Sequence, residues 1–230
     1  MSKDTVKRVT LFDSTDLTAA EEYFSQMAQK GLMLKKYGPI SHFRRSEPCK
    51  LRFSVQVIPA ARGENYVKKT SEYVDLCEQA GWTCVSGAAG MYVFATDRSD
   101  VPDVVTDPQE RIEAVTKQSI GGMIVSFLLS LWLSIKVVGL VSNLIEGKSF
   151  ASQMAYELPY SLLWLSVFLL FITKTVSFLK WRRNAKRDSA AGRAIRFYGL
   201  RASRQRRILL AVFFCLLAVS LGAFIIGLFI

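Results

Sequence analysis

The sequence predicts an α+β protein: an N-terminal duplicated strand–helix–strand–strand domain with a mostly antiparallel sheet, then an all-α region of three transmembrane helices. Two observations carry this prediction. The phrase EYFSQMAQKGL at 22–32 recurs fifty positions later as EYVDLCEQAGW at 72–82, with Glu, Tyr, Gln and Gly in register. Three long apolar stretches occupy the second half of the chain, at 119–141, 158–179 and 208–230. The first observation indicates a repeated unit and the second a membrane region.

The first repeat is expected at about 6–46. Apolar residues between Leu17 and Ala28 recur three and four positions apart, which predicts one buried helix face. Asp16 or Thr18 can cap the start of this helix, and Gly31 supplies a left-handed stop. Strands are expected on both sides of the helix, at 7–12, 32–37 and 40–45.

The second repeat, at about 51–96, follows the same order. LRFSVQVI at 51–58 alternates apolar and polar residues, as a strand with one packed face does. A helix face runs from Tyr66 to Ala80, and Gly81 is its stop. Strands are expected at 82–85 and 91–95, with SGAAG as the turn between them. One such unit cannot cover its own apolar face, whereas two related by a pseudo-dyad can, with both helices on one side of the sheet. The cytoplasmic domain is therefore assigned to 1–97.

A linker and a juxtamembrane helix are expected at 98–118. The stretch 96–105 is polar and interrupted by proline, and TDPQE then provides a helix start with Asp107 as N-cap and Pro108 at the first position. No helix breaker separates this start from the first apolar stretch. Two interpretations stay open, a rod that couples the domain to the membrane and a plain tether.

Each apolar stretch of the transmembrane region, 119–230, is long enough to cross about 30 Å of hydrocarbon as a helix. The alternative, buried helices of a soluble protein, would require a very large core around all three. Small residues from Ala211 to Gly222 lie on one face of the third stretch, which would permit packing against the other spans or a homodimer through this span.

The charge distribution predicts the orientation. Residues 1–118 carry 16 Lys/Arg and 16 Asp/Glu, whereas residues 180–207 carry eleven Lys/Arg and one acid, a net charge of +10. Loops rich in Lys and Arg stay on the cytoplasmic side, and the sequence start contains no apolar signal-peptide core. We therefore expect a multi-pass protein of the cell inner (cytoplasmic) membrane with a cytoplasmic N-terminus and the C-terminus outside.

The basic loop 180–207 is expected to contact the bilayer, and anionic lipid in particular, through proximity of its charges. Nucleic acid and an acidic protein surface are alternatives, of which nucleic acid is unlikely because the topology rule already accounts for the charge. The candidate contacts are Arg182, Arg183, Lys186, Arg204, Arg206 and Arg207.

The sequence shows no catalytic chemistry. Its single histidine, His42, has no evident partners, and the four cysteines show neither CxxC pairing nor metal-ligand spacing. We therefore predict no catalytic, cofactor-binding or metal-binding residues, no cofactor and no enzymatic activity. If the domain binds a ligand or partner, the candidates lie on its less apolar sheet positions. They are Arg44, Arg52, Trp82 and Tyr92, with the alternative that the arginines are solvated and the aromatic residues belong to the core.

Three blocks resemble a bacterial membrane-protein family, domain of unknown function 2812. The blocks are FDSTDLTAAEEYFSQMAQKGLMLKKYG, EYVDLCEQAGWTCVSGAAGMYVF and DVVTDPQERIEAVTK. The resemblance implies a domain of this kind joined to a few membrane spans, often encoded beside PadR-type transcription regulators, and it brings no established activity. Leu32 departs from the tryptophan usual there. The unit order also resembles gyrase-inhibitor-like effector-binding domains, whose groove between repeats holds small molecules or a partner.

These observations predict a regulatory or sensory membrane protein whose cytoplasmic domain recognises a ligand or partner, such as a transcription regulator or a transporter subunit. A structural or accessory subunit of a membrane complex such as a transporter is the first alternative. An unrecognised membrane enzyme is the second.

Overall fold

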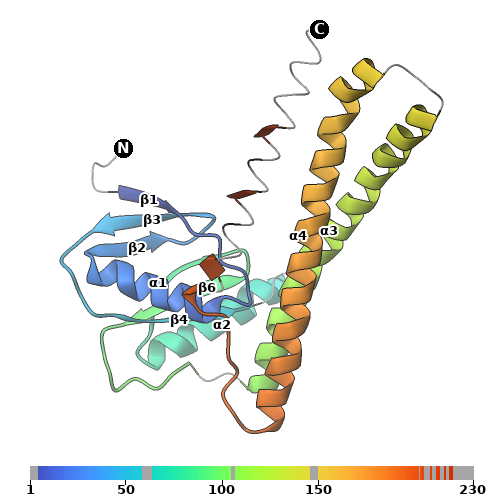
Figure 1. Ribbon diagram of the computed structural model, residues 1–230. Coiled ribbons are helices and arrows are strands. Elements are labelled where there is room, and N and C mark those ends of the chain that lie inside the picture. The colour runs from blue at the N-terminus through green and yellow to red at the C-terminus, as the bar shows by residue number, and fades with distance from the viewer. Residues whose placement is uncertain are drawn as a thin grey trace. The chain divides into compact units, whose positions relative to one another are not determined.

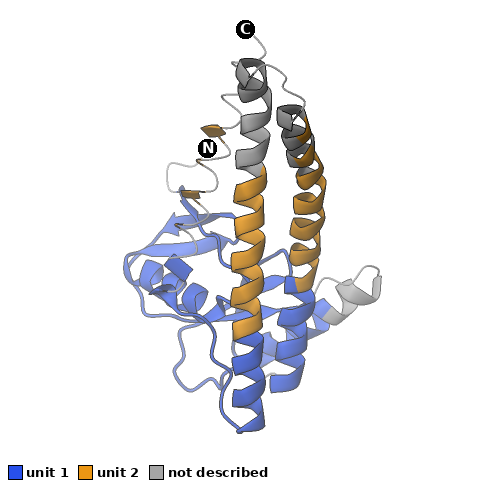
Figure 2. Ribbon diagram, turned by 45° about the vertical axis from the view of Figure 1, so that its right-hand side comes forward, with its two compact units in different colours: residues 1–119, 181–204 blue, residues 120–180, 205–230 orange. Residues whose placement is uncertain are grey.

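A computed structural model describes residues 5–58, 64–104, 107–145, 150–201, 203–204, 208, 211–212, 215 and 218–219. The chain forms two compact units, shown in different colours in Figure 2. The first unit comprises residues 1–119 and 181–204, and the second comprises residues 120–180 and 205–230. Each unit is described by itself below.

The first unit contains the strand–helix–strand–strand order twice (Figure 1). The first copy consists of β1 (Thr5–Val9), α1 (Leu17–Gln29), β2 (Leu32–Lys36) and β3 (Ile40–Arg45). The second copy consists of β4 (Arg52–Val57), α2 (Glu64–Gln79), β5 (Thr83–Ala88) and β6 (Met91–Thr96). The α+β class and the repeated order of elements are as predicted.

The two copies build separate sheets rather than the shared sheet that the sequence predicted. The strand orders are β1-β3-β2 and β4-β6-β5, and every pairing is antiparallel. The edge strands β2 and β5 contact each other, and the Ser86 hydroxyl there accepts a hydrogen bond from the Tyr37 amide at 2.9 Å. Register shifts interrupt both edges, between Leu34 and Lys36 and between Cys84 and Ser86. Bulges of this kind twist an edge strand and end its pairing, which explains why one sheet does not form.

The duplication extends to backbone conformation. Gly31 follows α1 with φ +72°, and Gly81 follows α2 with φ +94°. Both positions lie between a helix and a strand, as expected of the repeated phrase. The two register shifts also lie fifty residues apart, so the two copies match from the helix stop into the strand.

Helix α1 carries the core that joins the two copies. Phe24 is 1% exposed, and its ring lies 6.4 Å from that of Phe43 on β3 and 5.9 Å from that of Phe53 on β4. A first-copy helix therefore packs against both sheets. A second cluster gathers Cys77, Trp82 and Phe94 of the other copy with Val101 of the linker that follows it.

The turn between β5 and β6 is shorter than the predicted turn SGAAG. Strand β5 runs through Ala88, and only Ala89 and Gly90 connect it to β6, with φ values of +50° and +77°. Two-residue hairpin turns favour positive φ at both central residues because this matches the strand twist. Ser86, Gly87 and Ala88 therefore belong to the strand.

Two long helices follow the repeats: α3 (Pro108–Ile145) and α4 (Phe150–Ala190). The Gln109 amide donates to the Asp107 carboxylate at 2.9 Å, which confirms the predicted cap of α3. The basic stretch from residue 180 is not a loop at its start, because α4 continues to Ala190. Between residues 180 and 190 the buried residues are Trp181, Ala185 and Asp188, spaced four and three apart, so one face of this helical segment is buried among the charges.

The second unit contains the apolar parts of α3 and α4. Within the described residues, two helices are long and apolar enough to cross a membrane, not the three that the sequence predicted. The third expected span, 208–230, lies mostly outside the described residues. In the most apolar windows of the two helices only 11% and 22% of residues are buried. This exposure is unlike that of a core helix in a soluble protein.

Inside the second unit, α3 and α4 contact each other through aromatic side chains and one polar bond. The Trp164 indole donates to the backbone carbonyl of Ser130 at 3.2 Å. The rings of Phe127 and Phe171 lie 5.7 Å apart. Such a bond to a backbone oxygen satisfies the polar end of a large apolar side chain.

Candidate functional site

The residues proposed for a ligand groove lie in different surroundings. Arg44 on β3 is exposed, Tyr92 on β6 is partly buried, and Trp82 is only 3% exposed. The structure brings two of them together, since the Arg52 guanidinium lies over the Trp82 ring at 5.5 Å from its centroid. Gly87 makes room for Tyr92, because a Cβ at this glycine would lie 2.5 Å from the tyrosine ring.

Arg52 and Trp82 hold the linker that leads to α3. Arg52 donates to the carbonyls of Ser99 and Val101, at 3.3 and 2.9 Å, and forms an ion pair with Asp103. The Trp82 indole donates to the Pro102 carbonyl at 3.0 Å. These bonds satisfy linker carbonyls that the sheets leave unpaired. The pair therefore fixes residues 99–103 on the second copy.

A second set of contacts fixes the beginning of α3 to the repeats. The Ser119 hydroxyl shares a hydrogen bond of 2.8 Å with the Ser14 hydroxyl, which precedes α1. The Gln118 side chain donates to the Ala89 carbonyl at 2.7 Å, in the β5–β6 turn. One turn of α3 thus touches both copies.

The chain after α4, residues 191–201, contacts the start of α1 and is called the returning segment below. The Tyr198 amide donates to the Thr15 carbonyl at 3.0 Å, and the Ala19 amide donates to the Tyr198 carbonyl at 3.2 Å. The second bond satisfies an amide in the first turn of α1, which has no partner within its own helix. We call these contacts, with those of Gln118 and Ser119, the joint.

A stack of two aromatic rings and a guanidinium adds to the contacts of the joint. The Phe197 ring stacks on Trp181 of α4 at 5.5 Å, and the Arg111 guanidinium of α3 lies 4.6 Å from the centre of the same ring. A guanidinium over an aromatic face is attracted by the ring quadrupole, by about 0.5–2 kcal/mol depending on desolvation. The stack therefore links α3, α4 and the returning segment.

Glu21 on α1 provides a carboxylate beside the joint. It accepts a hydrogen bond from the Val55 amide of β4 at 2.9 Å. Burial raises the pKa of Glu21, while the Val55 amide and the positive charge of Arg111 act to lower it, and Asp103 and Glu22 raise it further. Burial outweighs the favourable partners, so ionised Glu21 is less stable here than in water.

The residues proposed for lipid contact lie in three different settings. Arg182, which is partly buried, and Lys186, which is exposed, line a pocket, whereas Arg183 and Arg204 are exposed and do not line it. Arg206 and Arg207 lie outside the described residues. The only acid of the basic stretch, Asp188, is buried and pairs with Arg193 at 3.4 Å and Arg196 at 3.2 Å. These pairs shape the turn after α4 and reduce the net charge there.

The described residues offer little for covalent or metal chemistry. Burial raises the pKa of the Cys77 and Cys84 thiols, which lowers the thiolate fraction that a nucleophile needs. No group of three His, Cys, Asp or Glu residues gathers among the described residues.

Comparison with known proteins locates the domain within a family. Residues 16–128 match the family described as "Protein of unknown function (DUF2812)". Over this stretch the protein belongs to the DUF2812 family. The match confirms the resemblance seen in the sequence, and it spans α1 to the apolar part of α3. No curated protein and no solved structure matches the chain. The likeness to gyrase-inhibitor-like domains therefore stays a prediction.

Sequence reasoning missed the joint, part of which lies outside the stretch that matches the DUF2812 family. The signal that could have revealed it is the apolar face of Trp181 and Ala185 within KWRRNAKRDSA, continued by Phe197 and Tyr198. The density of positive charge around these residues favoured an interpretation as a membrane-surface loop. Only the fold shows that Tyr198 bonds to Thr15 and Ala19, at the start of α1, and that Phe197 stacks on Trp181.

Proposed function

We propose that this protein is a multi-pass protein of the inner membrane whose cytoplasmic domain senses a ligand or partner and transmits its state to the membrane helices. The protein carries out no catalysis in this proposal. The sensing part is the duplicated domain, and the transmitting part is the joint. The partner is a transcription regulator or a transporter subunit.

The membrane placement is supported by the exposure of the apolar helices. Large apolar side chains on α3 that remain exposed include Val125 at 65%, Trp132 at 56% and Ile135 at 66%. Soluble proteins rarely expose apolar patches of this extent, whereas lipid accommodates them. The net charge of +10 over 180–207 supports a cytoplasmic position for the domain.

The joint is the observation that carries the proposal. A plain tether would leave the beginning of α3 free of the domain, yet Gln118 and Ser119 bond to Ala89 and Ser14. The returning segment adds a second attachment through Tyr198. Because α3 and α4 are each continuous between the two units, a change at either attachment is passed to a rigid element. This favours the coupled rod over the tether.

The test is amide hydrogen exchange of the full chain in detergent micelles, comparing Phe197→Ala with the unmodified protein. Phe197→Ala removes the ring that contacts both Arg111 and Trp181. We expect faster exchange in three separate segments, the start of α1, the first turns of α3 and the end of α4. Coupled elements open together as one cooperative unit.

Phe94→Ala is the control, because this residue is fully buried in the second-copy core away from the returning segment. It should accelerate exchange in β5, β6 and α2. If Phe197→Ala affects only residues 191–204, the two helices are tethered and not coupled. In that case an accessory subunit that assembles through its spans becomes the better proposal, and co-purification of a transporter would support it.

A further inference from the structure

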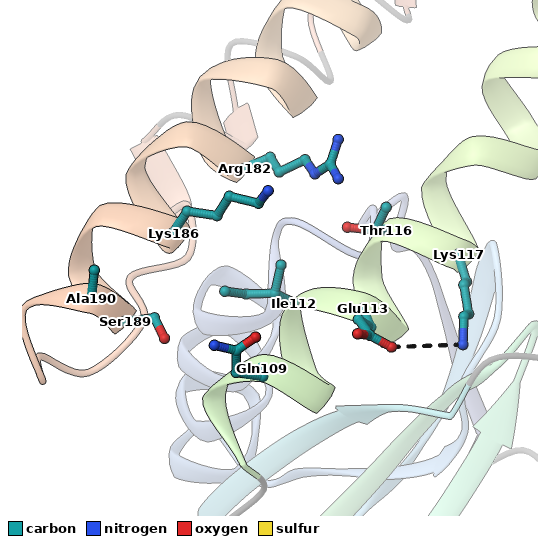
Figure 3. A pocket seen from close by; sticks show the side chains of 9 residues that line it. All are labelled: Gln109, Ile112, Glu113, Thr116, Lys117, Arg182, Lys186, Ser189 and Ala190. Carbon is teal, nitrogen blue, oxygen red and sulfur yellow. Dashed lines mark ion pairs between the residues drawn. The ribbon is translucent and has the colours of Figure 1, made fainter.

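A basic pocket lies within the first unit, between the first turns of α3 and the last turns of α4 (Figure 3). Its volume is about 520 Å³. Two cationic residues form its α4 wall, Arg182 and Lys186, one helical turn apart. Figure 3 shows both extending from α4 toward the α3 side. The remaining lining residues are Gln109, Ile112, Glu113, Thr116, Lys117, Ser189 and Ala190.

The charge of the pocket favours an anion. Lys117, Arg182 and Lys186 carry three positive charges and Glu113 one negative charge, a net charge of +2. The Glu113 carboxylate is paired with Lys117 at 3.9 Å. This pair neutralises the one acidic group of the lining. Arg182 and Lys186 therefore face the pocket as its uncompensated charges, since no ion pair of theirs occurs among the described residues.

Two polar atoms at the pocket lack partners. The Arg182 Nε and the Thr116 Oγ1 are buried from solvent and have no hydrogen-bond partner in the described part of the chain. Buried polar atoms nearly always have a partner, because an unpaired one has lost its hydrogen bonds to water without replacement. The amide of Gln109 and the hydroxyl of Ser189 add further hydrogen-bonding groups. The lining thus presents more donors than the protein itself satisfies.

We infer that this pocket binds the phosphate group of an anionic ligand. A guanidinium, an ammonium and a hydroxyl together provide the charge-assisted bonds that phosphate oxygens accept most strongly. The same chemistry fits the head group of an anionic phospholipid and a small soluble phosphate compound. Thr116 and Arg182 would obtain from the phosphate the partners that they lack.

The position of Arg182 favours the phospholipid. This residue lies three positions beyond 179, where the second predicted span ends, or about 4.5 Å along the helix. That is the depth of the head groups next to the hydrocarbon. The lipid source rests on the proposed membrane placement of α4, whereas the phosphate chemistry of the pocket does not.

Arg183 provides a matched control on the same helix. It carries the same charge as Arg182 and is its immediate neighbour, but it is exposed and does not line the pocket. A diffuse attraction between the basic stretch and an anionic surface would weaken equally when either residue is neutralised. A pocket requires Arg182 and not Arg183.

The experiment is calorimetric titration of the full-length protein in an uncharged detergent. One arm uses inorganic pyrophosphate, another uses short-chain phosphatidylglycerol, and a third uses short-chain phosphatidylcholine as the zwitterionic comparison. We expect Arg182→Gln to weaken binding of phosphatidylglycerol about tenfold or more, as loss of a charge-assisted bond predicts. Arg183→Gln should change it less than about twofold. Lys186→Gln, compared with Arg187→Gln, provides a second pair should Arg182→Gln fail to fold.

The arms separate the two sources of phosphate. Binding of phosphatidylglycerol without pyrophosphate identifies a lipid site, and binding of pyrophosphate identifies a site for soluble phosphates that stands even if α4 does not span a membrane. Equal losses from the Arg182 and Arg183 variants would overturn the inference in favour of diffuse attraction. Failure of all probes to bind the unmodified protein would overturn it as well.

Discussion

Gly31 shows how a single residue holds the repeat in shape. Its φ of +72° is in the left-handed region, and an added Cβ would lie 2.6 Å from the backbone oxygen of Ser46. The same turn therefore excludes side chains for two independent reasons, backbone conformation and space. Only glycine combines the helix stop with close approach of the chain that follows β3.

We predict that Gly31→Ala destabilises the domain by at least about 2 kcal/mol, because the left-handed conformation alone costs an alanine about 1–2 kcal/mol. The Ser46 backbone must also shift. Thermal unfolding of the full chain, followed by tryptophan fluorescence, should show a midpoint lower by about 4–8 °C. Gly38→Ala is the control, since its Cβ would meet nothing closer than 3.8 Å. Equal midpoints for both variants would contradict the prediction.

Glu21 gives the domain a pH dependence of known sign. Its pKa is raised above the ordinary value of 4.5 by burial, against the opposing effects of the Val55 amide and Arg111. Between 4.5 and the raised pKa, the folded state binds more protons than the unfolded state. The free energy of unfolding must therefore fall as pH rises through this window.

Glu21→Gln should remove this slope, because glutamine does not titrate and its side-chain oxygen can still accept from Val55. The measurement is the unfolding midpoint at a series of pH values from 4 to 8, and the quantity compared is the slope of this midpoint against pH. Loss of the Glu21 charge beside Arg111 shifts the midpoint by the same amount at each pH and so leaves the slope unaffected. Glu22→Gln, an exposed neighbour on the same helix, should leave the slope unchanged. A slope that survives Glu21→Gln would assign it to another group.

Residue-level reasoning from sequence identifies groups that matter but does not predict their contacts within the chain. The sequence predicts a ligand groove at Arg52 and Trp82, and the structure shows that both bond to the linker at Ser99, Val101 and Pro102. In the sequence, an arginine and an aromatic residue look the same whether they bind a ligand or another part of the chain. The difference lies in long-range contacts, which composition and spacing do not encode.

At the scale of elements, the linker held by Arg52 is the element most open to test. Because Arg52 donates to two carbonyls and pairs with Asp103, Arg52→Ala should accelerate amide exchange across residues 98–104. The exposed pair with Asp103 contributes little by itself, about 0–1 kcal/mol. We expect the loss of the carbonyl bonds to dominate.

Arg44→Ala is the control, because Arg44 is an exposed arginine of the other copy that was assigned to the same groove. It should leave exchange in the linker unchanged. If both variants bind an added ligand or partner more weakly while the linker keeps its exchange rate, the groove interpretation is right and the bonds of Arg52 to the linker are incidental.

Element boundaries were predictable where local chemistry sets them. Asp107 and Pro108 marked the start of α3, and the two glycines marked the ends of α1 and α2. The sequence could not show that β5 continues to Ala88, because a two-residue turn with Ala89 in the left-handed region is not an obvious turn. It could not show two sheets either, since that outcome depends on edge bulges in β2 and β5.

For the molecule as a whole, charge and hydropathy both favour placement of α3 and α4 in a membrane. The domain carries equal numbers of acidic and basic residues, and the basic excess lies after α4. Fifteen large apolar side chains in the described parts of α3 and α4 are exposed, among them Leu128 and Leu179. Water would not favour such a surface, at about 25 cal/mol for each Å² of apolar area. Lipid around both helices removes this cost.

The orientation follows from the same charges and can be tested by cysteine accessibility in intact cells. In a variant whose four cysteines are replaced, Ala191→Cys lies in the basic stretch after α4, and Phe150→Cys lies at the beginning of α4. Positive charge resists translocation, so we expect position 191 to be protected from a membrane-impermeant reagent and position 150 to react. Permeabilised cells should label both positions.

Labelling of 191 and protection of 150 would invert the topology and place the duplicated domain outside. Labelling of neither position in intact cells would show that α3 and α4 do not cross the membrane. In that event their exposed apolar faces would require a protein partner instead of lipid.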